Sequence, residues 1–151
     1  MKQKLSKRFP VYVAVSWLTA GWAGSAAGHT LSGSLGNAAG ATDFYQIACS
    51  DDGNGTPADL ITSIETTSAG ETPHVSVQAR VNAAASNSTD PTNGDGDSSP
   101  SAKLSAGPNL YNILIDKDGP GTAYYVLQYH CLTSKRVETG ATDSPPPVQN
   151  Q

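Results

Sequence analysis

Residues 123–133 read Ala-Tyr-Tyr-Val-Leu-Gln-Tyr-His-Cys-Leu-Thr, a run rich in aromatic and aliphatic side chains. Successive side chains of a β-strand point to opposite faces of the sheet. One face of this run would therefore carry Tyr125, Leu127, Tyr129 and Cys131, which are suited to a buried core. The stretch predicts a core β-strand.

The same alternation recurs elsewhere in the chain. Short segments of alternating apolar and polar residues lie between clusters of Gly, Pro, Asn, Asp and Ser, and helical periodicity is hard to find. The sequence therefore predicts an all-β fold, a single antiparallel β-sandwich of about seven strands with one disulfide. The expected strands span residues 29–35, 43–50, 60–66, 74–82, 103–105, 110–116 and 123–133.

The first 27 residues predict a secretory signal peptide. Residues 1–10 are basic, residues 11–23 are apolar and residues 24–28 are small, which is the three-part layout of such peptides. The apolar stretch is shorter than the roughly 20 residues that span a bilayer. We expect cleavage after Ala27 or Gly28, no transmembrane segment after cleavage, and a secreted product that is extracellular, on the cell surface or periplasmic.

The two cysteines of the chain lie 82 residues apart. An even cysteine count in a small exported domain favours a disulfide. Two free thiols, an intermolecular bridge and a metal pair are the alternatives, although zinc usually takes four ligands in closely spaced pairs. Because Tyr45, Ile47 and Cys49 share one face of their strand, we predict a Cys49–Cys131 disulfide in the core. It would restrict the unfolded chain by about 4 to 5 kcal/mol in chain-entropy theory.

The charge distribution argues against nucleic-acid partners. Four of the nine Lys and Arg residues lie in the first ten positions, and every one of the 13 acidic residues lies from Asp43 onward. The expected mature chain therefore carries five basic and 13 acidic residues. Because affinity for nucleic acids rests largely on cationic contacts with phosphates, we expect no nucleic-acid partner.

Two segments lack the composition of core strands. Residues 83–101 contain few large apolar side chains, so burial cannot offset their ordering entropy, and we expect an exposed loop that is mobile or ligand-bound. Residues 138–151 include three consecutive prolines, which favour an extended or disordered tail. The predicted organisation is a signal peptide at 1–27, a β-sandwich domain at 28–137 and a flexible Pro-rich tail at 138–151.

Two patterns resemble known families. Tyr129-His130-Cys131 resembles the tyrosine corner of immunoglobulin-like domains, although the core Trp of that family is missing because the last Trp is Trp22. Four further segments are together similar to the bacterial pre-peptidase C-terminal domains, β-sandwich modules of secreted proteins. These segments are 31–35 (Leu-Ser-Gly-Ser-Leu), 43–47 (Asp-Phe-Tyr-Gln-Ile), 106–111 (Ala-Gly-Pro-Asn-Leu-Tyr) and 123–127 (Ala-Tyr-Tyr-Val-Leu). The resemblance implies an exported, non-catalytic sandwich that binds, positions or assembles, and it supplies no catalytic residue.

No histidine lies in a recognised catalytic motif. A Ser-His-Asp triad needs a nucleophile beside an imidazole, yet none of His29, His74 and His130 has such a local context. Paired carboxylates for glycoside hydrolysis depend on spatial pairing, which spacing in the sequence does not reveal. The acidic residues cluster in loops, which favours turn residues over catalytic ones. We expect a protein that is not an enzyme.

Two metal sites are candidates. Acidic turns place carboxylate oxygens beside Gly, as calcium sites require, although such clusters are also common in ordinary turns. The candidate calcium ligands are Asp95, Asp97, Asp116 and Asp118. If cleavage falls after Gly28, His29 carries both a free amino group and an imidazole, a chelating pair suited to copper. His74 or His130 would be the second histidine of that site.

The expected N-terminal strand offers a means of assembly. In residues 29–35, His29, Leu31, Gly33 and Leu35 alternate with polar residues, and such a strand can pair with its own sheet or with a neighbouring copy. We therefore predict a secreted, non-enzymatic structural protein, a self-associating β-sandwich subunit of an extracellular fibre or surface matrix that uses strand exchange. The alternative is a periplasmic or extracellular module that binds a metal or another ligand, with calcium at the acidic loops or copper at His29.

Overall fold

Nine β-strands and no helix form the part of the chain that this computed structural model describes, residues 28–71 and 73–151. The expected signal peptide, residues 1–27, lies outside the described residues. The strands are β1 (His29–Leu35), β2 (Asp43–Ala48), β3 (Pro57–Thr66), β4 (Val75–Val81), β5 (Ala84–Thr89), β6 (Ala102–Ser105), β7 (Leu110–Lys117), β8 (Ala123–Thr133) and β9 (Glu138–Thr139). The all-β prediction is confirmed, with nine strands rather than seven. Nothing helical in the described ranges is long and apolar enough to cross a membrane.

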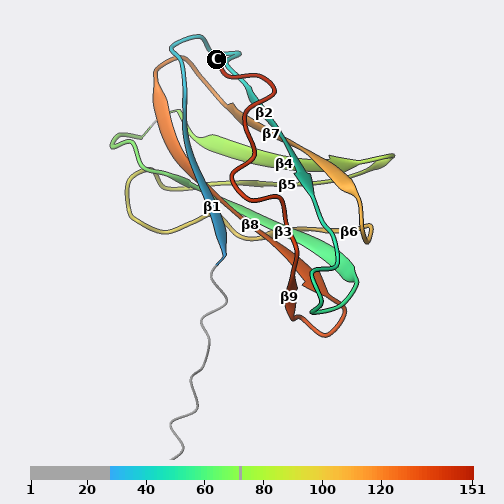
Figure 1. Cartoon of the computed structure of the whole chain (residues 1–151). Coiled ribbons are helices and arrows are strands. Elements are labelled where there is room, and N and C mark those ends of the chain that lie inside the picture. Colours follow the sequence, from blue (N-terminus) through green and yellow to red (C-terminus); the bar gives the residue numbers. More distant parts are fainter. Residues whose placement is uncertain (1–27, 72) are drawn as a thin grey trace, which may run out of the picture.

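The strands form two antiparallel sheets packed as a sandwich (Figure 1). Sheet A has the order β1-β8-β3-β6, with β9 also pairing with β8, and sheet B has the order β2-β7-β4-β5. The first strand thus pairs with the eighth, the second with the seventh, the third with the sixth and the fourth with the fifth. This is the order of one long hairpin rolled into a double sheet, a jelly roll.

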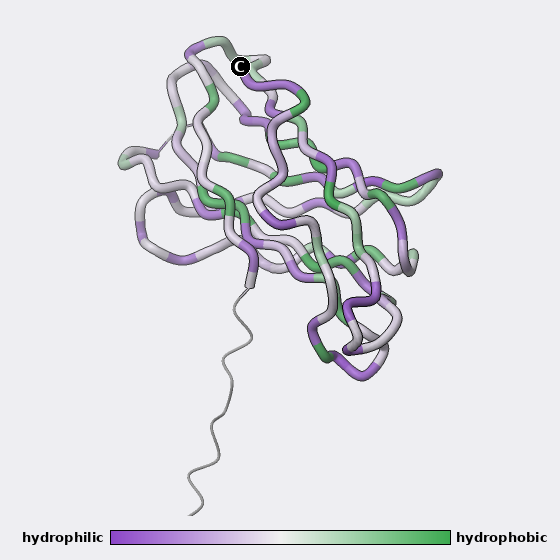
Figure 2. The backbone as a smooth tube through the Cα atoms, in the orientation of Figure 1, coloured by the Kyte–Doolittle hydropathy of each residue, from purple (hydrophilic) through white to green (hydrophobic). Residues whose placement is uncertain are grey.

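The core lies between the sheets and is filled by alternate residues of their strands. Along the strands in Figure 2, hydrophobic and hydrophilic residues alternate. On the β2 side the buried residues include Tyr45, Ile47 and Cys49, and on β8 they include Tyr125, Leu127, Tyr129 and Cys131. Burying a large apolar side chain contributes roughly 1.5 to 3 kcal/mol. The two faces predicted from alternation are therefore the two faces that meet in the core.

A disulfide joins the two sheets. Cys49 follows β2 of sheet B, Cys131 lies on β8 of sheet A, and their Cα atoms are 5.6 Å apart, within the usual range for a bridge. No free cysteine remains in the described ranges. The predicted pairing is confirmed, because the inward parity of the two strands brings these side chains together.

The segment 83–101, predicted as an exposed loop, contains a strand. β5 pairs with β4 along its whole length, and Asn82 turns the hairpin with a φ of 51°, a left-handed conformation that Asn tolerates better than most residues. The remaining loop is also anchored, because the Oδ2 of Asp90 accepts a hydrogen bond from Thr66 N at 2.6 Å. The prediction was wrong because an edge strand is held by backbone hydrogen bonds and needs few apolar side chains.

Residues 138–151 pack along the sandwich, which corrects the expectation of a flexible tail. β9 pairs with β8, Ala141 bridges to Cys49, and Gln149 bridges to Phe44. The tail thereby covers the outer edge of β2, whose backbone groups would otherwise be exposed. Composition did not indicate this because the prolines fall between the paired positions, where no backbone donor is required. The sandwich domain therefore extends to residue 151.

Candidate functional site

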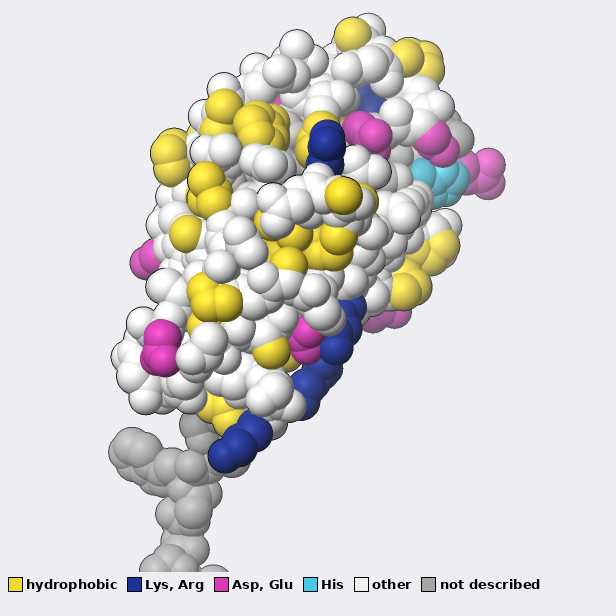
Figure 3. Space-filling view, turned by 90° about the vertical axis from the view of Figure 1, so that its right-hand side faces the viewer, with side chains coloured by type: hydrophobic (Ala, Val, Ile, Leu, Met, Phe, Trp, Pro, Cys, Tyr) yellow, Lys and Arg dark blue, Asp and Glu magenta, His cyan; other side chains and the backbone are white. Residues whose placement is uncertain are grey.

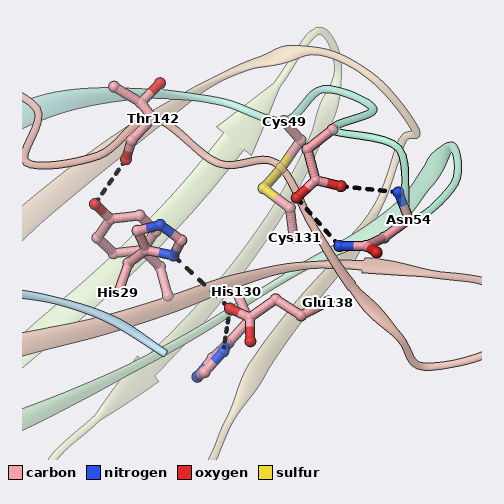
Figure 4. A network of polar contacts seen from close by, with 9 residues as sticks. His29, Cys49, Asn54, His130, Cys131, Glu138 and Thr142 are labelled. Carbon is pink, nitrogen blue, oxygen red and sulfur yellow. Dashed lines mark hydrogen bonds and ion pairs between the residues drawn. A yellow bond between two sulfur atoms is a disulfide. The ribbon is translucent and has the colours of Figure 1, made fainter. Parts of the chain in front are cut away.

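Three polar side chains meet where β1 begins (Figure 4). β3 occupies one side of β8, so β1 and β9 lie one after the other along its other side. This pairing places His29 opposite Tyr129 and Glu138 opposite Leu132. His130 lies between those two positions on β8 and therefore contacts the strand ends that carry His29 and Glu138.

The carboxylate of Glu138 lies between the two imidazoles. Its Oε1 is 3.1 Å from Nδ1 of His130 and 3.7 Å from Nδ1 of His29. Only the first contact is a hydrogen bond, and the Nδ1 of His29 is buried without a hydrogen-bond partner. The exposed fractions of the side chains are 18% for Glu138, 25% for His29 and 29% for His130. Partial shielding of this kind strengthens electrostatic contacts relative to open water.

Neighbouring groups fix the orientation of both rings. The His29 ring stacks on Tyr129 with 5.3 Å between ring centroids and 22° between planes, and the Tyr129 hydroxyl donates to the carbonyl of Thr142 in the tail at 2.8 Å. His130 lies against Gly28, where an added Cβ would be 2.1 Å from Cε1 and 2.6 Å from Nε2 of the ring. A side chain at residue 28 would therefore require the His130 ring to move.

The structure decides which histidine approaches His29. His130 does so, whereas His74 pairs with Asp118 through its backbone N at 2.8 Å and its Nδ1 at 2.9 Å. Hydrogen bonds from the ring and then the backbone N–H of His74 lower the pKa of Asp118 below its usual value. Sequence reasoning missed Glu138, which belongs to the segment predicted as a flexible tail and reaches the site only through the pairing of β9 with β8.

The four candidate calcium ligands do not lie together, and two of them hold hydrogen bonds within the protein. The Oδ1 of Asp95 accepts a hydrogen bond from Asp97 N at 2.9 Å within a turn, Asp116 is exposed on β7, and Asp118 holds His74. Within residues 28–71 and 73–151, no three His, Cys, Asp or Glu side chains converge in a way that would hold a metal ion. Calcium binding stays a prediction.

The four edges of the two sheets differ in their protection. The tail covers β2, and β6 is a short strand whose Lys103 pairs with Asp59, with Nζ 2.8 Å from Oδ2. β1 and β5 contain no Lys, Arg, Asp, Glu or Pro, and their outer edges make no backbone hydrogen bond to another described segment. Charges, prolines and covering segments are the usual protection of edge strands. β1 and β5 are therefore open to pairing.

The outer face of sheet B carries a shallow depression of about 460 Å³. Its lining consists of Thr42, Phe44, Arg80, Asn112, Leu114 and Gln149. Elsewhere on the surface, the side of the molecule in Figure 3 shows groups of hydrophobic side chains among uncharged polar atoms, with Lys and Arg side chains along its lower right margin and acidic side chains spread over the face. The depression lacks an acid, thiol or imidazole in its lining, and sequence patterns did not single out its residues because they alternate with those of the core.

Comparison with models of protein families, with curated proteins and with solved structures finds no match to this chain. The resemblances to immunoglobulin-like and pre-peptidase C-terminal domains therefore stay expectations. In the tyrosine corner the hydroxyl bonds to backbone a few residues upstream, whereas the Tyr129 hydroxyl bonds to Thr142, which lies downstream. The case for function rests on the geometry of the site and of the sheet edges.

Proposed function

We propose that this protein is an exported, non-enzymatic structural subunit whose copies join through their sheet edges into an extracellular fibre or surface matrix. The observation that carries the proposal is the pair of unprotected edge strands, β1 and β5. Open edges of this kind present unpaired N–H and C=O groups to which another strand can add. The inter-sheet disulfide would keep each subunit rigid during assembly.

The two open edges lie on opposite sides of the sandwich. β1 and β2 are the edge strands of one side, whereas β5 and β6 lie near each other on the other side. β1 belongs to sheet A and β5 to sheet B, so pairing β5 of one copy with β1 of the next joins two different surfaces. Such a heterologous contact produces a filament when it does not close into a ring.

The way β1 is held in its own chain favours edge addition over strand exchange. β1 pairs with β8 over seven residue pairs, from His29 opposite Tyr129 to Leu35 opposite Ala123, and Leu35 is fully buried. Strand exchange would first have to break this pairing, whereas addition to the free side of β1 leaves it intact. We therefore propose that the contact between copies forms between the intact outer edges of β1 and β5.

The exported mature protein provides the test. Electron microscopy and size exclusion should show filaments that lengthen with protein concentration. Asn87→Lys introduces a charge at an exposed position of β5, and Thr30→Lys does the same on β1. Each variant should remain monomeric, because a lysine on an edge strand opposes pairing with another chain.

Gln78→Lys is the matched control. Gln78 lies directly opposite Asn87 on the central strand β4 and is also exposed. The substitution adds the same charge without altering an open edge, so filaments should persist. Unmodified protein that stays monomeric at every concentration, or equal assembly by Gln78→Lys and Asn87→Lys, would rule out edge addition.

A further inference from the structure

Three strands of sheet B carry a row of polar side chains beside a pair of apolar ones on their outer face. Antiparallel pairing places Gln46 on β2 opposite Asn112 on β7, and Asn112 opposite Arg80 on β4. In the adjacent row, Phe44 on β2 lies opposite Leu114 on β7. These residues alternate with core residues of the same strands, so their side chains point away from the core. The outer face therefore combines an apolar surface with hydrogen-bonding groups directly beside it.

The depression of about 460 Å³ lies over these two rows, and its volume is within the range of ligand-binding pockets. The tail closes it at the β2 edge, where Phe44 N donates to Gln149 O at 2.9 Å and Gln149 Nε2 donates to Thr42 O at 2.9 Å. On its floor, Gln46 Nε2 donates to Asn112 Oδ1 at 3.1 Å, which orients the Asn112 amide. These contacts within the chain form the depression without a ligand.

The charges of this face favour an uncharged ligand. Arg80 and Asp116 are the only charged side chains at the outward positions of β2, β4, β5 and β7. Arg80 takes part in none of the ion pairs of the described residues. Because it lines the depression, it repels a cation there. An anion would meet one arginine in a domain whose residues 28–151 include five basic and 13 acidic side chains.

A sugar chain has the chemistry that matches this face. The C–H groups of a pyranose ring pack on aromatic and aliphatic side chains, while its hydroxyl groups both donate and accept hydrogen bonds. Amide side chains offer donors and acceptors, and the guanidinium group of arginine offers five donors. Strands of a sheet lie about 4.8 Å apart, close to the length of one sugar residue in an extended chain. A chain laid across the strands therefore meets a new strand at each sugar.

We propose that the outer face of sheet B binds a neutral polysaccharide, which lies across β2, β7 and β4 in this depression. Phe44 and Leu114 pack against its sugar rings. Asn112, Gln149 and Arg80 form hydrogen bonds with its hydroxyl groups. The face is separate from the outer edges of β1 and β5, so binding goes beyond edge-to-edge assembly and does not require it.

Titration of the exported protein with neutral hexasaccharides tests the ligand class. The probes are cellohexaose, mannohexaose, xylohexaose, chitohexaose and maltohexaose, with the galacturonic acid hexamer as the acidic comparison. At least one neutral hexamer should bind with a Kd below about 1 mM. Its affinity should not change between about 0.01 and 1 M salt, because an uncharged ligand forms no screened ion pair. Failure of all five neutral hexamers to bind, or tighter, salt-sensitive binding of the acidic hexamer, would overturn the proposal.

Substitution of the aromatic residue tests the site. Phe44→Ala should weaken binding of the hexamer about tenfold or more, as truncation of a central contact residue does, whereas Phe44→Tyr keeps the ring and should restore binding. Tyr124→Ala is the matched control, because Tyr124 is an aromatic residue with 58% of its surface exposed on the outer face of sheet A. Circular dichroism checks that each variant is folded. Equal affinities for Phe44→Ala and Tyr124→Ala would contradict the site.

Nuclear magnetic resonance locates the bound hexamer without a substitution. The backbone amides of Phe44, Arg80 and Asn112 should shift, and the amide of Tyr124 should not. Shifts confined to sheet A would place the ligand elsewhere and overturn the proposal. The edge variant Thr30→Lys should bind the hexamer as tightly as the unmodified protein, so a failure of edge assembly is distinguishable from a failure of this site. If no hexamer binds and Phe44→Ala instead reduces the oligomeric state, the face packs against a second copy and the polysaccharide proposal is wrong.

Discussion

Gly33 leaves room for one of the largest side chains of the core. A Cβ at this position would lie 2.2 Å from the hydroxyl oxygen and 2.4 Å from Cζ of Tyr125. That hydroxyl donates to the Oδ2 of Asp43 at 2.5 Å and lies 2.8 Å from the hydroxyl of Tyr45. The Oδ1 of Asp43 accepts a hydrogen bond from Gln151 N at 2.9 Å. A glycine in the expected assembly strand therefore supports a buried polar network.

Gly33→Ala should lower the free energy of unfolding by about 3 kcal/mol, because the added methyl group displaces Tyr125 and leaves buried polar groups unpaired. Urea denaturation of the monomer measures this change. Gly40→Ala is the control, since a Cβ at Gly40 meets no atom within 4 Å, and its effect should stay within about 0.5 kcal/mol. Similar losses for the two variants would show that Gly33 does not act through Tyr125.

At the scale of elements, the tail and β2 stabilise each other. The backbone hydrogen bonds between the tail and the β2 region include Phe44 N to Gln149 O, Ser50 N to Gly140 O and Thr142 N to Ala48 O. A chain that ends at Val137 should lose at least about 3 kcal/mol of unfolding free energy, at about 1 kcal/mol for each of these three bonds, because the further contacts of the tail are lost as well. It should also aggregate, because the edge of β2 is then open. Urea denaturation and light scattering measure the two effects.

A chain that ends at Gln149 separates these contributions. It keeps the backbone bonds of Phe44, Ser50 and Thr142 described above and loses only the contacts of the last two residues, among them the bond from Gln151 N to Asp43. We expect it to be more stable than the chain that ends at Val137 and to remain dispersed. If the two truncated chains have the same stability, the pairing of the tail with β2 contributes nothing measurable.

Whether a strand could be predicted from the sequence depends on whether side-chain burial or backbone pairing holds it in place. β2 and β8 were predictable because burial of one face imposes an alternation of two residues. β5 and β9 were not, since their backbones are held by a neighbouring strand while their side chains are small, polar or few. The candidate metal site is a similar case. The place of His29 next to the expected cleavage site was enough to indicate it from the sequence. Its approach to His130 and Glu138 depends on the register of β1, β8 and β9, which local sequence patterns do not encode.

On the scale of the whole molecule, the space between the sheets is rich in buried tyrosine. Burial is the main cause that raises the pKa of Tyr45, Tyr111 and Tyr125 above the ordinary value. For Tyr125, the hydrogen bond to Asp43 raises the pKa further, because that bond requires the protonated hydroxyl. Ionisation of these tyrosines is therefore opposed by the folded sandwich and not by the unfolded chain.

This difference predicts that the sandwich loses stability in alkaline solution. Above about pH 10 the unfolded chain releases tyrosine protons that the folded core retains, so the unfolded state binds fewer protons and the free energy of unfolding falls as pH rises. The contribution is fully present below about pH 10. Above that pH, each tyrosine whose pKa is raised by burial, Tyr129 included, contributes a slope of up to about 1.4 kcal/mol per pH unit until the pH reaches its pKa in the folded protein. Urea denaturation from neutral pH to about pH 11 measures the slope of unfolding free energy against pH. Tyr111→Phe should reduce this slope by the contribution of one tyrosine. Constant stability across this range would mean that the buried hydroxyls ionise as readily in the folded protein as in the unfolded chain.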